Sequence, residues 1–256
     1  MKRECRLKID QVLVLVSKDF KIKYNATALG FLWSILVPLF TSCVYYFVFG
    51  VMMRFDTPNY LLYLMSGTFL WQFFSNVVMQ SGTVLSGNVA LLKKTSFDRA
   101  LLVGGTFFTE AIHFLLTIPV LLIIMLVYDV RPDFATFVPN LLACMAALYL
   151  FSVGVGYAYA ACNLFFRDLE RIVALLLMMW MFCSPVFLPL SVIPVEYLWI
   201  FDINPMAMIL GVWRDMFYDP AWHPFIHVRV ILIGVAVYAA GRFLFRKMDP
   251  RFAEMM

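Results

Sequence analysis

Two ionisable side chains lie inside an otherwise apolar stretch, and they are the first candidates for chemistry. Glu110 and His113 fall at i and i+3 within residues 101–128, which contain no other charged residue. Residues three apart share one face of a helix, and an ionisable group inside a membrane-spanning helix is costly enough to indicate a function. The pair predicts either an internal structural pairing or a proton or cation site.

Aromatic rings and amides recur along two neighbouring apolar runs, at the spacing of one helix face. Amides have little use on a lipid-facing surface, so these faces should pack on protein or line a pathway. Rings can stack on the apolar faces of sugars, and amides can exchange hydrogen bonds with sugar hydroxyls. Ordinary helix packing is the alternative. The candidates for a substrate channel are Tyr45, Phe49, Phe69, Phe73, Asn76, Gln80 and Trp180.

Several motifs of hydrolytic and metal-binding sites are missing from the sequence. No Gly-Lys dipeptide occurs, so the chain has no P-loop. HExxH, GxSxG and CxxC are also absent, and four of the five cysteines lie in apolar runs. We therefore predict that this chain is not an enzyme and binds no metal or cofactor, and that ATP and Mg²⁺ would be bound by a partner.

The composition is that of a membrane protein. Hydrophobic residues make up 63% of the 256 residues and charged residues 14%, against about 45–50% and about 25% in soluble domains. Spans of about 20 apolar residues fit six times. The predicted fold is a single all-α integral membrane domain over residues 1–256, with transmembrane helices near 30–53, 60–85, 101–128, 134–166, 172–190 and 226–245.

The basic residues fix an orientation. If the chain alternates sides, sixteen of the twenty lysines and arginines fall on one side of the membrane. The positive-inside tendency makes that side cytoplasmic, with both termini on it. The scatter of these charges over short segments indicates topology and argues against nucleic-acid binding. The other side holds Arg54, Arg131, Arg214 and Arg229.

Two segments depart from the spanning pattern. Within 8–24, apolar residues at i, i+3, i+4, i+7 and i+11 predict an amphipathic helix at the membrane surface; they are Ile9, Val12, Leu13, Val16 and Phe20. Within 185–225, repeated prolines interrupt an apolar stretch. Proline ends helices, so this stretch predicts short re-entrant or interfacial helices on the external side.

The cytoplasmic connection 86–99, SGNVALLKKTSFDR, mixes apolar and charged side chains. A connection that only set the topology would need the charges but not the apolar residues. The segment therefore predicts a docking surface for a soluble partner. Residues 167–171 have a similar character, with a solvated turn as the alternative.

Together these segments resemble the permease subunit of type-2 ABC exporters, in particular their polysaccharide branch, which includes O-antigen permeases. The resemblance lies in KDFKIKYNATALGFLWSILVPL at 18–39, NVALLKKTSFDRALL at 88–102, NLFFRDLERIVALLLMMWMFCSPVFLP at 163–189 and NPMAMILGVWRDMFY at 204–218. It implies a soluble ATPase partner, a second copy of the chain, and a lipid-linked polysaccharide substrate in the bacterial inner membrane, among membrane lipids.

The resemblance also implies roles for individual residues. The predicted ATPase contacts are Lys18, Lys21, Lys23, Tyr24, Lys93, Lys94, Phe97, Asp98 and Arg99. The predicted external gate residues are Pro185, Phe187, Pro189, Pro194, Trp199, Pro205 and Trp213. The usual family pattern has proline where this chain has Asp98, so the resemblance implies the docking role of the first cytoplasmic loop and not its detailed shape.

The expected function is therefore the membrane half of an ATP-driven exporter of lipid-linked polysaccharide. Basic residues at the cytoplasmic mouth, such as Lys21, Lys23 or Arg99, would favour an anionic pyrophosphate linker. Two alternatives stay open. One is an exporter of capsule, teichoic acid or a small amphiphilic drug; the other is a proton-coupled carrier or membrane enzyme that uses Glu110 and His113.

Overall fold

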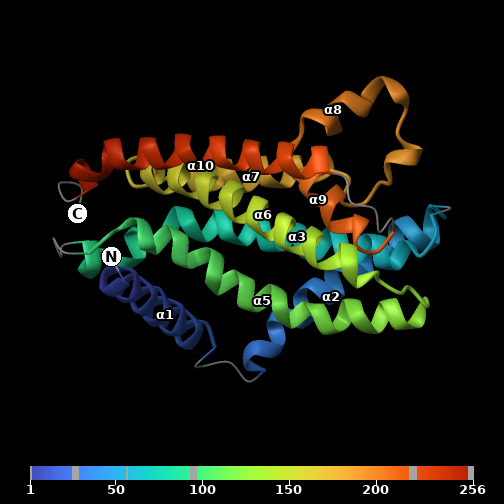
Figure 1. The fold of residues 1–256 in the computed structure, drawn as a ribbon, viewed down its shortest axis with the longest axis horizontal. Coiled ribbons are helices and arrows are strands. Elements are labelled where there is room, and N and C mark those ends of the chain that lie inside the picture. The colour runs from blue at the N-terminus through green and yellow to red at the C-terminus, as the bar shows by residue number, and fades with distance from the viewer. Residues whose placement is uncertain (1, 25–28, 56, 93–96, 219–223, 253–256) are drawn as a thin grey trace.

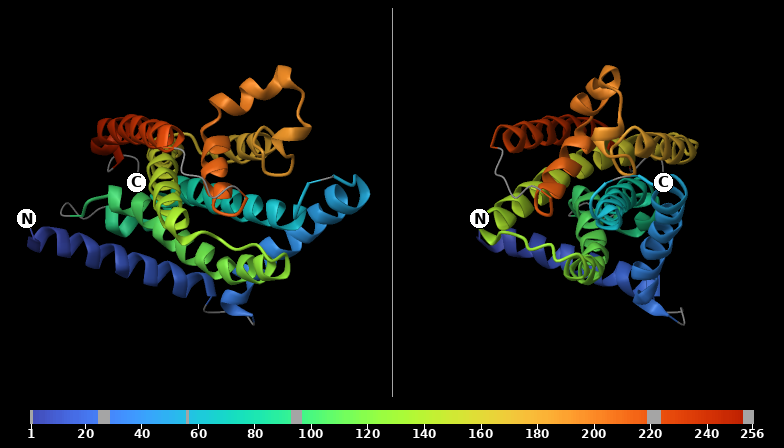
Figure 2. Two further views of the ribbon diagram at one scale, coloured as in Figure 1. Left: turned by 45° about the vertical axis from the view of Figure 1, so that its right-hand side comes forward. Right: turned by 90° about the vertical axis from the view of Figure 1, so that its right-hand side faces the viewer.

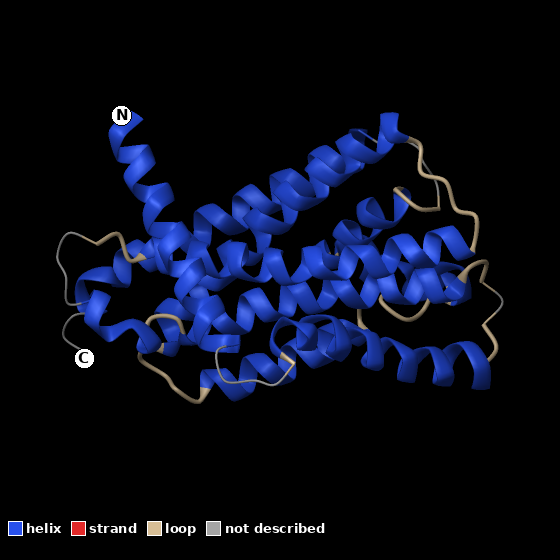
Figure 3. Ribbon diagram, turned by 90° about the horizontal axis from the view of Figure 1, so that it is seen from below, coloured by secondary structure: helices blue, strands red, loops and turns tan. Residues whose placement is uncertain are grey.

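The protein is a bundle of helices joined by short connections, as a computed structural model shows (Figure 3). The structure describes residues 2–24, 29–55, 57–92, 97–218 and 224–252, and these contain no strand. The predicted all-α fold is thereby confirmed. The α-helices are α1 Lys2–Tyr24, α2 Trp33–Tyr45, α3 Tyr60–Thr83, α4 Val89–Leu92, α5 Ala100–Val127, α6 Phe134–Asn163, α7 Leu169–Phe182, α8 Leu198–Ile203, α9 Pro205–Asp215 and α10 Pro224–Phe252.

Five helical segments in the described residues are long and apolar enough to cross a bilayer, and α8 with α9 makes a sixth only if this pair, bent by 92°, is counted as one span. The five are Gly30–Met52, which joins a 3₁₀ turn, α2 and the π-helix Tyr46–Met52, together with α3, α5, α6 and α10. The predicted span at 172–190 is shorter than expected. Its helix α7 has 14 residues, about 21 Å, and it ends before Pro185, because proline disfavours helix in the residue ahead of it.

The core lies along α3, which packs against α5 and α6, while α10 packs along α6 (Figure 1). In the α3 span 78% of residues are buried, against 11% in the span that contains α2. α6 and α10 approach closely where Gly154 faces Gly241, since a methyl group on Gly241 would lie 2.0 Å from the Gly154 carbonyl oxygen. α3 is therefore the central helix, and α2 leaves most of its surface uncovered.

Helix α1 begins at Lys2 and is longer than the predicted 8–24. It lies alongside α5 at the edge of the bundle (Figures 1 and 2). Among the α1 side chains that the structure describes, Leu15 and Val16 are buried, whereas Ile9 and Leu13 of the predicted stripe are more than half exposed. The apolar face of α1 thus divides between α5 and the surroundings.

The two chain ends lie at the same end of the bundle (Figure 1). α8 projects from the bundle near the opposite end, and its neighbour α9 turns back into it (Figures 1 and 2). α9 begins where Asn204 accepts a hydrogen bond from the Met206 amide at 3.0 Å and Pro205 occupies the first turn, a favourable N-terminal pairing. The proline-rich segment therefore forms short helices, as its sequence predicted.

Candidate functional site: a polar groove beside Glu110

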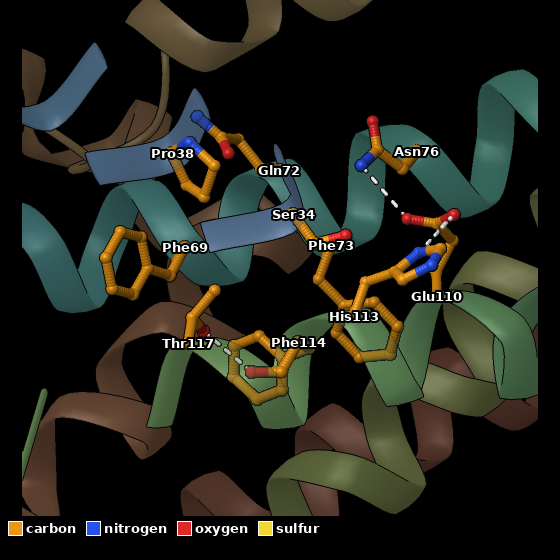
Figure 4. A pocket seen from close by; sticks show the side chains of 10 residues that line it. All are labelled: Ser34, Pro38, Phe69, Gln72, Phe73, Asn76, Glu110, His113, Phe114 and Thr117. Atoms are coloured by element: carbon orange, nitrogen blue, oxygen red, sulfur yellow. Dashed lines mark hydrogen bonds and ion pairs between the residues drawn. The ribbon is translucent and has the colours of Figure 1, made fainter. Parts of the chain in front are cut away.

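A groove with a volume of about 360 Å³ lies between α2, α3 and α5, and the end of α1 reaches it. A smaller hollow continues from it toward the rings of Phe69, Phe73 and Phe114 (Figure 4). The groove combines apolar, amide and charged side chains within one membrane-embedded surface. It is lined by Lys23, Trp33, Ser34, Val37, Pro38, Gln72, Asn76, Glu110 and His113.

The Glu110 carboxylate is the centre of the polar part of this groove (Figure 4). The residue is only 1% exposed. Asn76 donates to its Oε2 at 3.0 Å, and Gln80 donates to Oε1. His113 Nδ1 lies 3.0 Å from the same Oε1. Glu110 and His113 thus pair within α5, and the amides of Asn76 and Gln80 on α3 donate to the same carboxylate.

Lys23, at the end of α1, completes this cluster. Its ammonium group lies 3.1 Å from Glu110 Oε1 and 3.3 Å from His113 Nδ1. The ring of Phe20, one turn earlier, stacks on His113 with centroids 5.4 Å apart. Three helices, α1, α3 and α5, therefore meet at one buried carboxylate, and no local sequence pattern indicates that Lys23 pairs with Glu110 across 87 positions.

The arrangement suits binding better than acid–base chemistry. The Glu110 carboxylate accepts from the Lys23 ammonium and from two amides, and it lies beside the His113 imidazole. Three of these partners meet Oε1, so a proton on that oxygen would displace at least one of them. Among the residues that the structure describes, no three His, Cys, Asp or Glu side chains come together as metal ligands do.

The rings around the groove differ in how far they are accessible. Phe69 and Phe73 are 2% and 3% exposed, and Phe73 stacks on Phe114 at 5.0 Å. Trp33, by contrast, is 45% exposed at the groove. Sequence reasoning had not singled out Trp33 or Gln72. An uncharged amide inside a span is the signal that could have identified Gln72.

The remaining predicted channel residues lie elsewhere. Tyr45 and Phe49 pack on Phe187, with ring centroids at 4.5 and 5.4 Å. Trp180 packs edge-on against Phe74 at 5.6 Å and donates through Nε1 to Asn204 at 2.9 Å. In a single chain the seven candidates therefore fall into three separate groups.

The predicted ATPase contacts divide between two places: Lys23 lies in the groove beside Glu110, whereas Lys18, Phe97, Asp98 and Arg99 lie toward the end of the bundle that holds the termini. Lys18 of α1 donates to Asn88 Oδ1, which links the surface helix to the connection after α3. Beside this bond is a groove of about 500 Å³ lined mainly by α1, together with Leu91 and Phe97. Lys21 is exposed. Lys93, Lys94 and the Tyr24 side chain lie outside the described residues.

The end of the same connection is tied to α10. Arg99 donates to Asp249 Oδ1 at 2.8 Å, and Arg242 lies 3.9 Å from Asp98 Oδ1. Asp98 also accepts from the Ala100 amide at 3.2 Å, at the start of α5. Asp98 can therefore fix the start of α5 where the family pattern has proline.

The predicted gate residues differ in burial. Pro185, Phe187, Pro189 and Trp213 are buried, Pro205 is half-buried, and Pro194 and Trp199 are exposed. Trp213 donates through Nε1 to the Ser66 carbonyl oxygen at 3.0 Å. Arg214, which the charge count treated only as an external charge, is buried beside it.

Comparison with known proteins adds a second line of evidence. The profile of a family described as "ABC-2 type transporter" matches residues 10–218. The O-antigen export system permease protein RfbA of Klebsiella pneumoniae is 34% identical, and the alignment covers 96% of this chain and 95% of that protein. RfbA of Myxococcus xanthus is 30% identical over 95% and 94% of the two chains. The polysialic acid transport protein KpsM of Escherichia coli is 23% identical over 80% of each.

Proposed function

The chain belongs to the ABC-2 type transporter family, and on this premise we propose that it is the permease subunit of an exporter for lipid-linked, O-antigen-like polysaccharide. As a multi-pass member of this family it is an inner-membrane protein that works with a separate ATPase subunit. The observation that carries the proposal is the 34% identity, over nearly the whole of both chains, to an O-antigen export permease. The 23% identity to a polysialic acid transport protein makes capsule export the second candidate.

In this proposal both termini face the cytoplasm. The two ends share one end of the bundle (Figure 1), and sixteen of the twenty lysines and arginines belong to that side. The ATPase then docks on α1 and on the connection 86–99. The groove of about 500 Å³ between them supports this, because it is mainly apolar and lies beside exposed Leu7 and Val14.

The glycan passes along the groove beside Glu110, with Trp33 as its stacking surface. Trp33 is the exposed ring, and Gln72 and Asn76 lie beside it with hydrogen-bonding groups. A second copy of the chain closes the pathway. The uncovered surfaces of α2 and α7 support this arrangement, since most of α7 is exposed and only 11% of the α2 span is buried.

The test is polysaccharide export by this chain when it is expressed with a P-loop ATPase subunit. Loss of surface polysaccharide on inactivation of the ATPase is the expected result. Export that continues without any ATPase would overturn the proposed energy source.

A matched pair of variants tests the groove. Trp33→Ala should reduce export severalfold, because it removes the exposed ring on which the glycan is proposed to stack. Phe31→Ala is the control, since Phe31 is exposed two residues away but does not line the groove. If the two variants export polysaccharide equally well, Trp33 is not a stacking surface of the pathway.

A further inference from the structure

An irregular stretch of backbone follows α7, and side chains from other helices satisfy its carbonyl groups. Tyr60 donates to the Phe187 carbonyl oxygen at 2.9 Å. Tyr63 donates to that of Pro185 at 3.0 Å and to that of Leu188 at 3.1 Å. Non-helical backbone at membrane depth is tolerated only where protein or water supplies such partners. Side chains of α3 therefore hold the backbone of residues 185–188 in place.

Arg214 of α9 supplies the central part of this support. Its guanidinium donates to the carbonyl oxygens of Tyr63 and Val186, each at 3.0 Å, and also to that of Pro185. The guanidinium carbon lies 3.5 Å above the centre of the Tyr63 ring. The residue is only 7% exposed. A buried arginine whose hydrogen bonds all go to main-chain oxygens fixes backbone position, because its planar donors allow one arrangement.

The Arg214 side chain fits here because Gly67 has no side chain. Gly67 of α3 faces the guanidinium, and a methyl group there would lie 2.2 Å from Arg214 Nη2 and 2.9 Å from the Val186 carbonyl oxygen. Any other residue at this position would push either the arginine or the backbone of residues 185–188 out of place.

The backbone held in this way carries the ring of Phe187. The ring is 2% exposed, and it contacts Tyr45 and Phe49 of the first span and Phe182 of α7. Few residues of α2 and α7 are buried in the single chain: Pro38 and Ser42 on α2, and Leu177 on α7. Phe187 thus joins these two helices at the end of the bundle opposite to the chain termini.

We infer that Arg214 is the positioning residue of the external gate. Its guanidinium holds the backbone of residues 185–186 so that the Phe187 ring closes the space between the first span and α7. The inference rests on the proposed function, because it takes this end of the bundle as the external end of the export pathway. Beyond the proposed function, it identifies the Arg214 guanidinium as the group that positions the gate backbone. Neither the names of the relatives nor the charge pattern indicates this role.

The test measures leakage through the assembled complex of permease and ATPase, reconstituted in vesicles without ATP. Efflux of trapped carboxyfluorescein reports the gate alone. Arg214→Met keeps the length of the side chain but removes every donor, so efflux should rise about tenfold or more. Arg214→Lys, which keeps the charge and loses the planar fork, should fall between that variant and wild type. Arg229→Met is the control, since Arg229 is an exposed external arginine that donates to the Asp202 carbonyl oxygen at 2.9 Å.

Phe187→Ala keeps Arg214 in place and removes only the closing ring, so it should leak as Arg214→Met does. An assembled Arg214→Met complex as tight as wild type would overturn the inference, as would equal leakage by Arg229→Met. If Arg214→Met does not assemble, a tight Phe187→Ala complex overturns the inference. ATP-driven polysaccharide export by wild type is measured separately, so failure of the proposed function is distinguished from failure of the gate.

Discussion

The ion pair between Lys23 and Glu110 connects the surface helix α1 to the membrane-embedded core, and its contribution can be measured with a double-mutant cycle. The single changes are Glu110→Gln and Lys23→Met. Glutamine keeps one acceptor oxygen, and its amide group then faces either Asn76, the donor at Oε2, or Gln80 and Lys23, the donors at Oε1. The cycle therefore separates the pair from the rest of the cluster.

The two changes should differ in size. Removing one partner of a buried, hydrogen-bonded charge costs about 3–5 kcal/mol, and Glu110 is 1% exposed. The Lys23 side chain is 43% exposed, so solvent screening reduces its share to about 1 kcal/mol or less. We expect Glu110→Gln to cost about 3 kcal/mol, Lys23→Met about 1 kcal/mol, and the double variant no more than Glu110→Gln alone.

The assay is thermal unfolding of the purified complex in detergent. At about 2–4 °C per kcal/mol, Glu110→Gln should lower the Tm by about 6 °C or more. Glu170→Gln is the control, because Glu170 is an exposed carboxylate on α7. An unchanged Tm for Glu110→Gln would refute the reasoning. So would a Lys23→Met effect of the same size in both backgrounds, since it would mean that the ammonium does not interact with the carboxylate.

Three substitutions of glycine test the packing. Gly67→Ala should lower the Tm by several degrees and raise leakage, because the new methyl group would lie 2.2 Å from the Arg214 guanidinium; a tight, stable variant would contradict this geometry. Gly241→Ala should prevent stable folding, measured as loss of the monodisperse complex, because its methyl group would lie 2.0 Å from the Gly154 carbonyl oxygen. Gly104→Ala has no neighbour within 4 Å and should be neutral or stabilising by up to about 1 kcal/mol, so destabilisation by this change would count against the packing described for α5.

The sequence predicted the helical fold, the separate surface helix and the interrupted segment after α7. Each of these follows from local composition, because span length, basic residues and prolines act over neighbouring positions. The predicted length of α7 was wrong. The apolar sequence continues beyond Phe182, but the helix ends there because Pro185 follows. For α1, periodicity predicted an apolar face but did not say which of its side chains meet α5 and which meet the surroundings.

The sequence by itself determined that this chain lies in a membrane, which end carries the basic charge, and that Glu110 is an exceptional residue in its span. Only the tertiary structure decided which groups Glu110 meets, since Lys23 reaches it across 87 positions and through the packing of three helices. It also decided the place of Arg214. The charge count assigned this arginine only to one side of the membrane, whereas the structure shows it buried, bonded to carbonyl groups of the irregular backbone in the space left by Gly67. Burial of a charge depends on partners that no local pattern records.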